Sequence, residues 1–237
     1  MDIINPASGA IISTIKSDTQ RTLNSKLESL RKGQKSWIKT SIEHRLNCIK
    51  KFGELIQENK FDLAQILTSE TGKPLQQSLN EIQGAQNRVD HLLQHAEQWL
   101  APEVLVDEGS TLEHIKYEPL GVIANISAWN FPYNVGYNVF LYALVAGNSV
   151  LYKPSELATL TGKQFEIYLH LAGIPKDVFQ CIIGDGSFLM NCQDLQTIFQ
   201  ENINVIIVIV NKCTINSGFN VRFNSNVNNS TKKNYGF

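Results

Sequence analysis

The chain has 237 residues, 43% hydrophobic and 18% charged, with a formal net charge of −1. These values predict a globular protein with a sizeable core, and they give no sign of a nucleic-acid or membrane partner. Four widely spaced cysteines indicate neither a disulfide framework nor a zinc site, and they favour a cytoplasmic location: Cys48, Cys181, Cys192 and Cys213. We expect no signal peptide, and no apolar run is long enough to span a bilayer.

The first hundred residues have the apolar spacing of amphipathic helices. Asn5–Gly9 is typical of a turn between short extended pieces. Four helices are expected from apolar residues three, four and seven apart, over the ranges Leu23–Trp37, Ile42–Ile56, Phe61–Thr71 and Leu75–Ala96. Ser17 or Asp18 would cap the first helix, and Gly72 would end the third.

After Pro102 the pattern changes to strands. Alternation on both sides of Asp107–Ser110 predicts a β-hairpin with its turn at these residues. From Leu120 onward, strand and helix patterns alternate, which favours a parallel α/β sheet. The expected elements are Val122–Ile126, Tyr133–Ala146, Ser149–Tyr152, Ala158–Ala172 and Val178–Ile183.

The composition changes again after Ser187. Residues 188–237 contain eleven asparagines, as many as the 187 residues before them. Ile203–Val210 has the pattern of a strand, but the polarity of the rest predicts poor order. A native low-complexity tail explains this segment, and so does a coding sequence read out of frame; the second explanation is preferred.

Polar motifs follow the first two strands of the expected sheet. These are Trp129-Asn130-Phe131-Pro132 and Lys153-Pro154-Ser155-Glu156. Parallel strands that finish in polar groups suit a ligand at the carboxyl edge of a sheet. Together with Asn5–Gly9, Glu70–Pro74 and Gly184–Gly186, in this order, the motifs resemble the aldehyde dehydrogenase superfamily over residues 1–187.

The resemblance implies an α/β fold made of N-terminal helices, a β-hairpin oligomerisation arm and an incomplete Rossmann-like parallel sheet. The boundaries that follow are 1–102 for the helical N-terminal part of the cofactor-binding domain, 103–118 for the oligomerisation hairpin, 119–187 for the Rossmann-like βαβαβ cofactor-binding segment, and 188–237 for the divergent Asn-rich tail. The hairpin would join copies of the chain, or join it to intact homologues.

Asn130 is the candidate catalytic residue. When a cysteine thiolate attacks an aldehyde, the oxygen becomes negatively charged, and a fixed amide N–H directed at it stabilises that charge. The resemblance assigns this role to Asn130. Taken alone, an Asn at a strand end is more often the N-cap of the following helix.

The remaining candidate residues are implied to bind NAD or NADP. The nicotinamide half would lie along Ile126, Ser127, Ala128, Trp129 and Asn130, and the adenosine ribose against Lys153, Ser155 and Glu156. Gly186 would pass close to the cofactor. Glu156 would repel a 2′-phosphate, which favours NAD. Taken alone, a Lys–Glu pair in a loop is usually solvated surface.

The reaction implied is oxidation of an aldehyde to its carboxylate, with succinate semialdehyde as a candidate substrate. None of the four cysteines stands in the Gly-Gln-x-Cys setting of the family's nucleophile. We therefore expect a chain that is truncated before the catalytic Cys and inactive alone. The alternatives are a non-catalytic or nucleotide-binding fragment that associates with intact aldehyde dehydrogenases, and a product that does not fold stably. No metal site is expected, and His91 and His95 are interpreted as surface residues.

Overall fold

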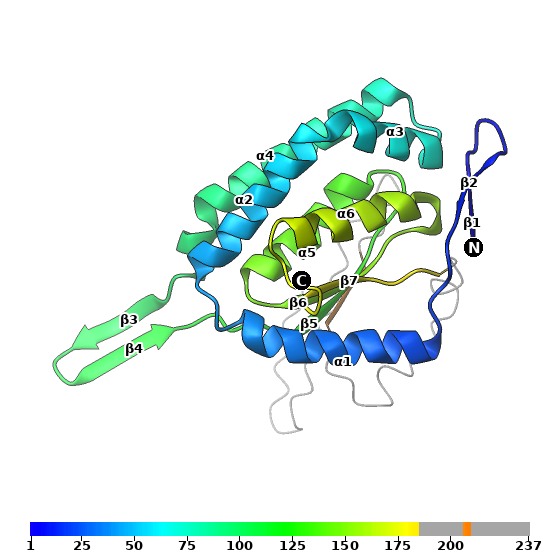
Figure 1. Ribbon diagram of the computed structural model, residues 1–237. Helices are drawn as coiled ribbons and strands as arrows, with labels where there is room; N and C mark the ends of the chain where they lie inside the picture. Colours follow the sequence, from blue (N-terminus) through cyan, green and yellow to red (C-terminus); the bar gives the residue numbers. More distant parts are fainter. Residues whose placement is uncertain (185–205, 210–237) are drawn as a thin grey trace, which may run out of the picture.

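A four-stranded parallel sheet lies at the centre of the structure, a computed structural model that describes residues 1–184 and 206–209 (Figure 1). Its strands are β5 (Val122–Ile126), β6 (Ser149–Lys153), β7 (Phe179–Cys181) and β8 (Ile206–Ile209). They lie in the order β7-β6-β5-β8. The chain thus moves outward from β5 to β7 and then returns to the other side of β5, which makes the β5/β8 boundary a topological switch point.

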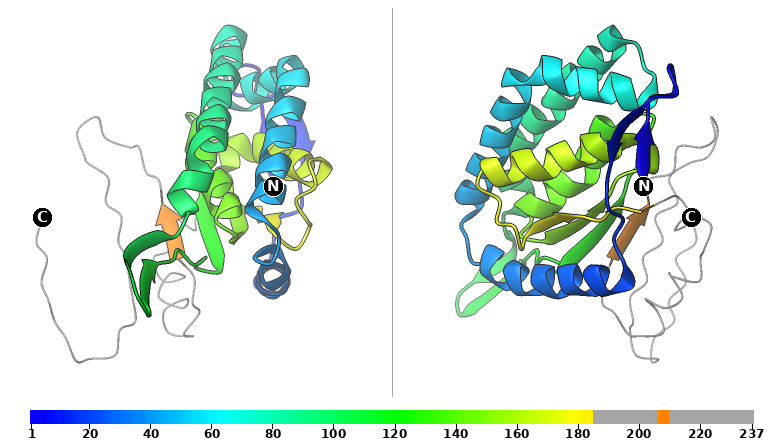
Figure 2. Two further views of the ribbon diagram at one scale, coloured as in Figure 1. Left: turned by 90° about the vertical axis from the view of Figure 1, so that its left-hand side faces the viewer. Right: turned by 45° about the vertical axis from the view of Figure 1, so that its right-hand side comes forward.

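Helices cover the sheet in layers. Helix α1 (Gln20–Trp37) packs on one face, while α5 (Pro132–Val145) and α6 (Thr159–Leu171) pack on the other (Figure 2). The outer layer over α5 and α6 consists of α2 (Ile42–Glu58), α3 (Lys60–Thr71) and α4 (Leu75–Leu100). All five residues of β6 are buried, as expected of a parallel strand that is covered on both faces.

Alternate residues of the strands enter two separate clusters. Val122 and Leu151 pack with Leu30 of α1, whereas Val150 and Tyr152 belong to the larger core under α5 and α6. Because side chains alternate along a strand, each face of the sheet receives its own set. The one-residue offset between the two sets therefore decides which helix covers which face.

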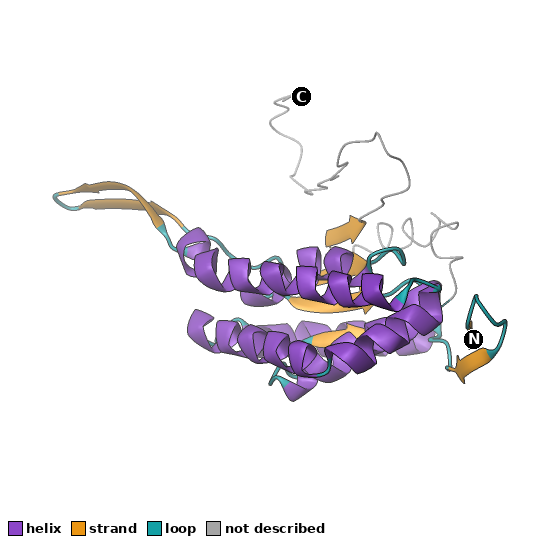
Figure 3. Cartoon of the chain, turned by 90° about the horizontal axis from the view of Figure 1, so that it is seen from above, coloured by secondary structure: helices purple, strands orange, loops and turns teal. Residues whose placement is uncertain are grey.

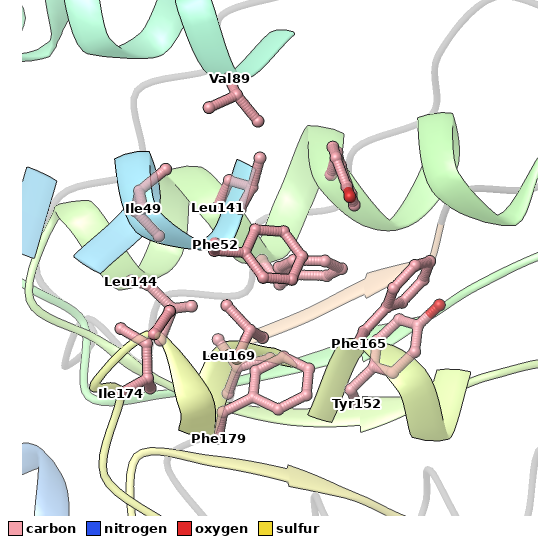
Figure 4. Packing of buried hydrophobic residues seen from close by; sticks show 14 of the residues in the cluster. Ile49, Phe52, Val89, Leu141, Leu144, Tyr152, Phe165, Leu169, Ile174 and Phe179 are labelled. Atoms are coloured by element: carbon pink, nitrogen blue, oxygen red, sulfur yellow. The ribbon is translucent and has the colours of Figure 1, made fainter. Parts of the chain in front are cut away.

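An aromatic cluster fills the space between the sheet and α5 and α6 (Figure 4). The ring of Phe165 lies 4.8 Å from that of Tyr133, 5.6 Å from Phe140 and 5.9 Å from Tyr152. Several pairs meet edge to face or tilted, the geometry in which the positive edge of one ring meets the negative face of the next. This cluster fixes α5 and α6 against the strands whose ends carry the candidate site.

Two helix ends show how the sequence sets the boundaries. Gly72 ends α3 in the left-handed conformation, at a φ of 70°, where a side chain would be strained. The cap of α1 is Thr19 instead of Ser17 or Asp18. Thr19 and Thr22 form a reciprocal capping box in which each side chain accepts the other's amide N–H. Threonine at the third helical position is not the usual Glu or Gln, so the motif was missed.

Two hairpins lie outside these layers, at opposite ends of the molecule (Figure 3). One pairs β1 (Asp2–Ile4) with β2 (Ile11–Thr14), and the other pairs β3 (Glu103–Glu108) with β4 (Thr111–Ile115). The second turn is therefore at Gly109-Ser110, shorter than the expected Asp107–Ser110. The β3–β4 hairpin extends away from the helices and exposes a set of large apolar side chains: Val104, Leu105, Leu112 and Ile115.

The expected fold class is confirmed: helices, a projecting hairpin and a parallel sheet occur in the predicted order. The four domain boundaries remain predictions. Within the segment expected to be a poorly ordered tail, β8 pairs with β5, which agrees with the strand pattern noted at Ile203–Val210. The other residues of 188–237 lie outside the described part of the chain. Among the described residues, no helix combines the length and apolarity needed to cross a membrane.

Candidate functional site

The ends of β5 and β6 meet at the carboxyl edge of the sheet. Ile126 and Lys153 are register partners, and the next residue, Ser127, donates its amide N–H to the carbonyl of Lys153 at 2.9 Å. Ile126, Ser127 and Lys153 are all buried. The structure thus brings together the two motifs, 27 residues apart in the register, that the sequence placed at one edge. This edge lies beside the switch point, where open α/β sheets bind ligands.

Asn130 lies in the turn between β5 and α5, half-buried between exposed Trp129 and Phe131. Its side-chain oxygen accepts the amide N–H of Phe131 at 3.1 Å. The Nδ2 group makes no hydrogen bond within residues 1–184 and 206–209. Because the oxygen is engaged and the nitrogen is not, the side chain presents a donor, which is what stabilisation of an oxyanion requires.

The alternative role for Asn130, as the cap of α5, does not match the geometry. The N-cap position belongs to Phe131, and within the described residues it makes no side-chain cap hydrogen bond. The carboxylate of Glu81, from α4, instead accepts the amide N–H of Tyr133 at 2.9 Å. A residue from another helix therefore satisfies the first turn of α5, which leaves Asn130 without a capping function.

Glu81 is also one half of a buried ion pair. Its partner, Lys73, donates to the Glu81 carboxylate and, at 2.8 Å, to the backbone carbonyl of Asn130. Burial raises the pKa of Glu81 above its usual range, although the Lys73 ammonium and the α5 amides lower it. The sequence indicated Lys73 only as part of the Glu70–Pro74 motif, and it did not predict a role for Glu81. The contact partners are too distant in the sequence to leave a local signal.

Glu70 caps the other crossover helix, α6, in the same way. The backbone N–H of Thr161 and the Thr161 hydroxyl each donate to it at 2.8 Å, and the N–H of Leu160 donates to its second oxygen. Burial raises the pKa of Glu70 to about 7, although these three donors lower it. Buried glutamates from the outer helical layer thus complete the N-termini of both helices that follow the candidate site.

The β6 motif forms a tight loop at the start of the 3₁₀ helix η1 (Glu156–Ala158). Ser155 accepts the N–H of Leu157 at 3.2 Å and donates to the Glu156 carboxylate at 3.3 Å. Lys153 is only 4% exposed and donates to the carbonyl of Pro154 at 3.2 Å. The interpretation of Lys153 as solvated surface is therefore wrong, whereas Glu156 is half-buried and reaches the surface.

A close approach of α6 shapes this loop. A Cβ added to Gly162 would lie 2.5 Å from Cβ of Pro154 and 3.2 Å from the Tyr152 ring. Real Cβ atoms do not approach that closely, so only glycine allows α6 to lie directly against the loop after β6. The expected cofactor contact at Gly186 lies outside the described residues.

The two described cysteines are poor nucleophiles. Cys48 and Cys181 are both buried and free, and burial raises the pKa of each thiol, so the reactive thiolate is scarce. Cys192 and Cys213 lie outside the described residues. Among residues 1–184 and 206–209, no three His, Cys, Asp or Glu side chains are grouped to hold a metal ion.

Comparison with known proteins shows which family the chain resembles. The family model described as aldehyde dehydrogenase family matches residues 1–198. The chain belongs to the aldehyde dehydrogenase family. Because the match extends over most of the 237 residues, it confirms the resemblance seen in the strand-end motifs, and the Asn130 turn lies within the matched range.

Two individual relatives are consistent with this assignment to the family. The N-succinylglutamate 5-semialdehyde dehydrogenase of Legionella pneumophila (strain Corby) is 29% identical over 202 residues, which cover 84% of this chain and 40% of that protein. An aldehyde dehydrogenase structure from Brucella melitensis biovar abortus 2308 has a TM-score of 0.77 at 26% identity and covers 87% of this chain and 42% of its own.

A third relative was solved with a nucleotide. It is the NADP-dependent glyceraldehyde-3-phosphate dehydrogenase of Bacillus halodurans C-125 in complex with NADP, with a TM-score of 0.74 at 28% identity over 80% of this chain and 41% of that one. The chain therefore spans about 40% of the length of the relatives it matches.

Proposed function

We propose that this chain supplies the oxyanion donor and part of the NAD(P) site of an enzyme that oxidises an aldehyde to its carboxylate. One observation carries the proposal: the hydrogen bond from the Ser127 amide to the Lys153 carbonyl joins both strand-end motifs at the switch-point edge of the sheet. In the proposed reaction, water supplies the second carboxylate oxygen and the hydride passes to the nicotinamide. A semialdehyde substrate is supported by the name of the Legionella relative, and succinate semialdehyde remains the candidate that we propose.

The residues after β6 fit the ribose of a dinucleotide. The Glu156 carboxylate can accept two hydroxyl donors, and the Ser155 hydroxyl already turns toward it. Lys153 lies beside the Ser127 end of β5, where the main chain of Ile126–Trp129 would border the nicotinamide. When bound, the cofactor supplies the hydride acceptor. Glu156 would repel a 2′-phosphate, so we propose NAD as the preferred form.

Asn130 acts on the aldehyde oxygen in this proposal. Its Nδ2 donor would stabilise the oxygen's negative charge after a thiolate attacks the carbonyl carbon, a contribution worth about 3 kcal/mol in comparable sites. Cys48 and Cys181 are buried with raised pKa values. None of the four cysteines of the sequence, Cys192 and Cys213 included, stands in the Gly-Gln-x-Cys setting. We therefore propose that the nucleophile is not among these 237 residues and that they do not oxidise aldehydes alone. The two free thiols support the expected cytoplasmic location.

The cofactor site is tested by replacing Glu156. We expect Glu156→Ala to weaken NAD binding about tenfold, because charge-assisted hydrogen bonds to the ribose are lost, and to narrow the preference for NAD over NADP. Binding is measured by isothermal titration calorimetry of the full chain with each nucleotide. Trp129, one of three tryptophans, is half-exposed beside the site, so quenching of the chain's tryptophan fluorescence gives a second measurement.

Glu118→Ala is the matched control, because Glu118 pairs with Lys116 between β4 and β5 and so precedes β5, whereas the site follows the other end of that strand. It should leave both affinities unchanged. The proposed cofactor site is wrong if the unaltered chain binds neither nucleotide at millimolar concentration, or if Glu156→Ala binds NAD as tightly as the unaltered chain. NADH production from an aldehyde by the pure chain would contradict the missing nucleophile.

We also propose that the β3–β4 hairpin joins this chain to another copy or to an intact homologue. Its apolar side chains Val104, Leu105 and Leu112 are each more than half exposed, and an exposed apolar surface of this kind is typical of an interaction site. The hairpin extends beyond the helical layers (Figure 3), and no third strand among residues 1–184 and 206–209 pairs with either of its edges. Such edges favour pairing with another chain.

The expected result is a molar mass above that of the 26.6 kDa monomer in light scattering coupled to size-exclusion chromatography. Leu105→Glu combined with Leu112→Glu should return the mass to that of one chain, because each change places a charge on the apolar face. Ile167→Glu is the control: Ile167 lies on α6 and is also exposed, at 45%. A mass unaffected by the hairpin pair, or reduced equally by Ile167→Glu, would exclude the hairpin as the interface.

A further inference from the structure

A buried ion pair lies behind the turn that carries Asn130. Lys73 follows the end of α3 and Glu81 lies on the second turn of α4, so both belong to the outer helical layer. The Lys73 side chain is 11% exposed, and that of Glu81 is fully buried. Burial of two charges is costly unless their hydrogen bonds are satisfied, so the further contacts of the pair show what it holds.

Those contacts are with residues in the turn and at the start of α5. Lys73 donates to the carbonyl of Asn130 at 2.8 Å, and its ammonium lies 4.3 Å from the centre of the Phe131 ring. Glu81 accepts the N–H of Tyr133 at 2.9 Å. The lysine therefore holds the main chain at Asn130, and the glutamate holds the first turn of α5. The ion pair links the two contacts into one unit.

The direction of the Asn130 side chain depends on this unit. Its oxygen accepts a hydrogen bond from the Phe131 amide. The orientation of the peptide between Asn130 and Phe131 therefore decides the direction of the free Nδ2 donor. We propose that Lys73 and Glu81 are positioning residues that fix this peptide and thereby orient the Asn130 donor. The inference rests on the proposed role of Asn130 as the oxyanion donor, and it identifies what holds that donor in place.

An oxyanion donor must be held in place before the reaction begins. A donor stabilises a developing charge only when it is already in place, because reorienting it during the reaction costs part of the gain. Asn130 lies in a turn with exposed neighbours, Trp129 and Phe131, and such positions move more than helices or strands. Charge-assisted hydrogen bonds are about twice as strong as neutral ones, and here they tie the turn to two helices.

The test uses nuclear magnetic resonance on the full chain without nucleotide. We expect Lys73→Met to shift the side-chain amide signal of Asn130 and to speed hydrogen exchange of the Tyr133 amide at least about tenfold. Lys73→Arg should restore both signals, since it keeps the positive charge and the N–H donors. Lys116→Met, which breaks the exposed pair with Glu118, should change neither.

The readout separates this inference from the proposed function, because it requires no cofactor or activity. If Lys73→Met does not fold, the double variant Lys73→Met/Glu81→Gln, which leaves no unpaired charge, replaces it with the same expected changes. An Asn130 signal and a Tyr133 exchange rate equal to those of the unaltered chain, in either folded variant, would overturn the inference even if NAD binds. Failure of Lys73→Arg to restore the signals would overturn it as well.

Discussion

Lys73→Met is expected to lower the free energy of unfolding by about 3 to 5 kcal/mol, because it leaves Glu81 as a buried charge without its partner. Glu81→Gln, which leaves the Lys73 ammonium buried at 11% exposure, should be similarly costly. The double variant Lys73→Met/Glu81→Gln removes both charges, so its cost should be well below the sum of the two. Urea unfolding, followed by circular dichroism at 222 nm, measures all three and yields the coupling energy.

The cost of Lys73→Met in unfolding free energy should also depend on pH. Burial already raises the pKa of Glu81, and removal of Lys73 should raise it further, so the carboxyl group takes up a proton instead of remaining charged. The cost of Lys73→Met should therefore be smaller at pH 5 than at pH 8. The exposed Lys116–Glu118 pair is the control, since breaking it should cost less than about 1 kcal/mol. Strictly additive single changes would exclude a coupled pair.

Local sequence patterns were sufficient to predict the helices and strands. The strand Val122–Ile126 has the bounds expected, and the end of α3 follows from the αL glycine at Gly72. Each of these features depends on neighbours within a few residues, such as the period of apolar side chains or the conformational freedom of one glycine. The order of the elements then restricts the sheet to a parallel arrangement.

What could not be predicted depends on contacts between distant residues. Glu81 lies 52 positions from Tyr133, and Glu70 lies 91 from Thr161. Capping motifs are recognised within four residues of the helix start, so a cap that comes from another helix leaves no local pattern. Asn130 was considered as the cap of α5 for this reason, although the structure assigns the capping to Glu81.

The burial of residues at the candidate site also could not be predicted from a local sequence pattern. Lys153 ends a strand and precedes Pro154, an arrangement that alone suggests solvent, yet it is buried, and α6 lies directly against the neighbouring Pro154 because Gly162 allows a close approach. The site residues that the sequence placed together do meet, at the Ser127–Lys153 hydrogen bond. Their roles in binding and catalysis remain predictions, and the Glu156 experiment addresses the binding of the cofactor.

The stability of the fold is expected to fall as the pH rises from 5 to 8, because of Glu70. Its pKa is about 7 in the folded chain, against 4.5 for an ordinary glutamate. Between these values the folded state binds more protons than the unfolded state, so unfolding becomes easier as protons become scarce. A difference of about 2.5 between the two pKa values corresponds to roughly 3 kcal/mol, lost between pH 4.5 and 7 and constant above that.

Urea unfolding at pH 5, 6, 7 and 8 measures this slope, and Glu70→Gln isolates it. The substitution keeps one acceptor oxygen, which can serve either the Thr161 donors or the Leu160 N–H, and it removes the titration, so the slope should flatten to what Glu81 contributes. Values below pH 5 are avoided, because Asp18 has a lowered pKa: burial would raise it, but Lys26 and the Ile183 amide prevail, and this stabilisation is lost in acid. An unchanged slope in Glu70→Gln, or greater stability at pH 8 than at pH 5, would mean that Glu70 is ionised throughout and that its three donors outweigh burial.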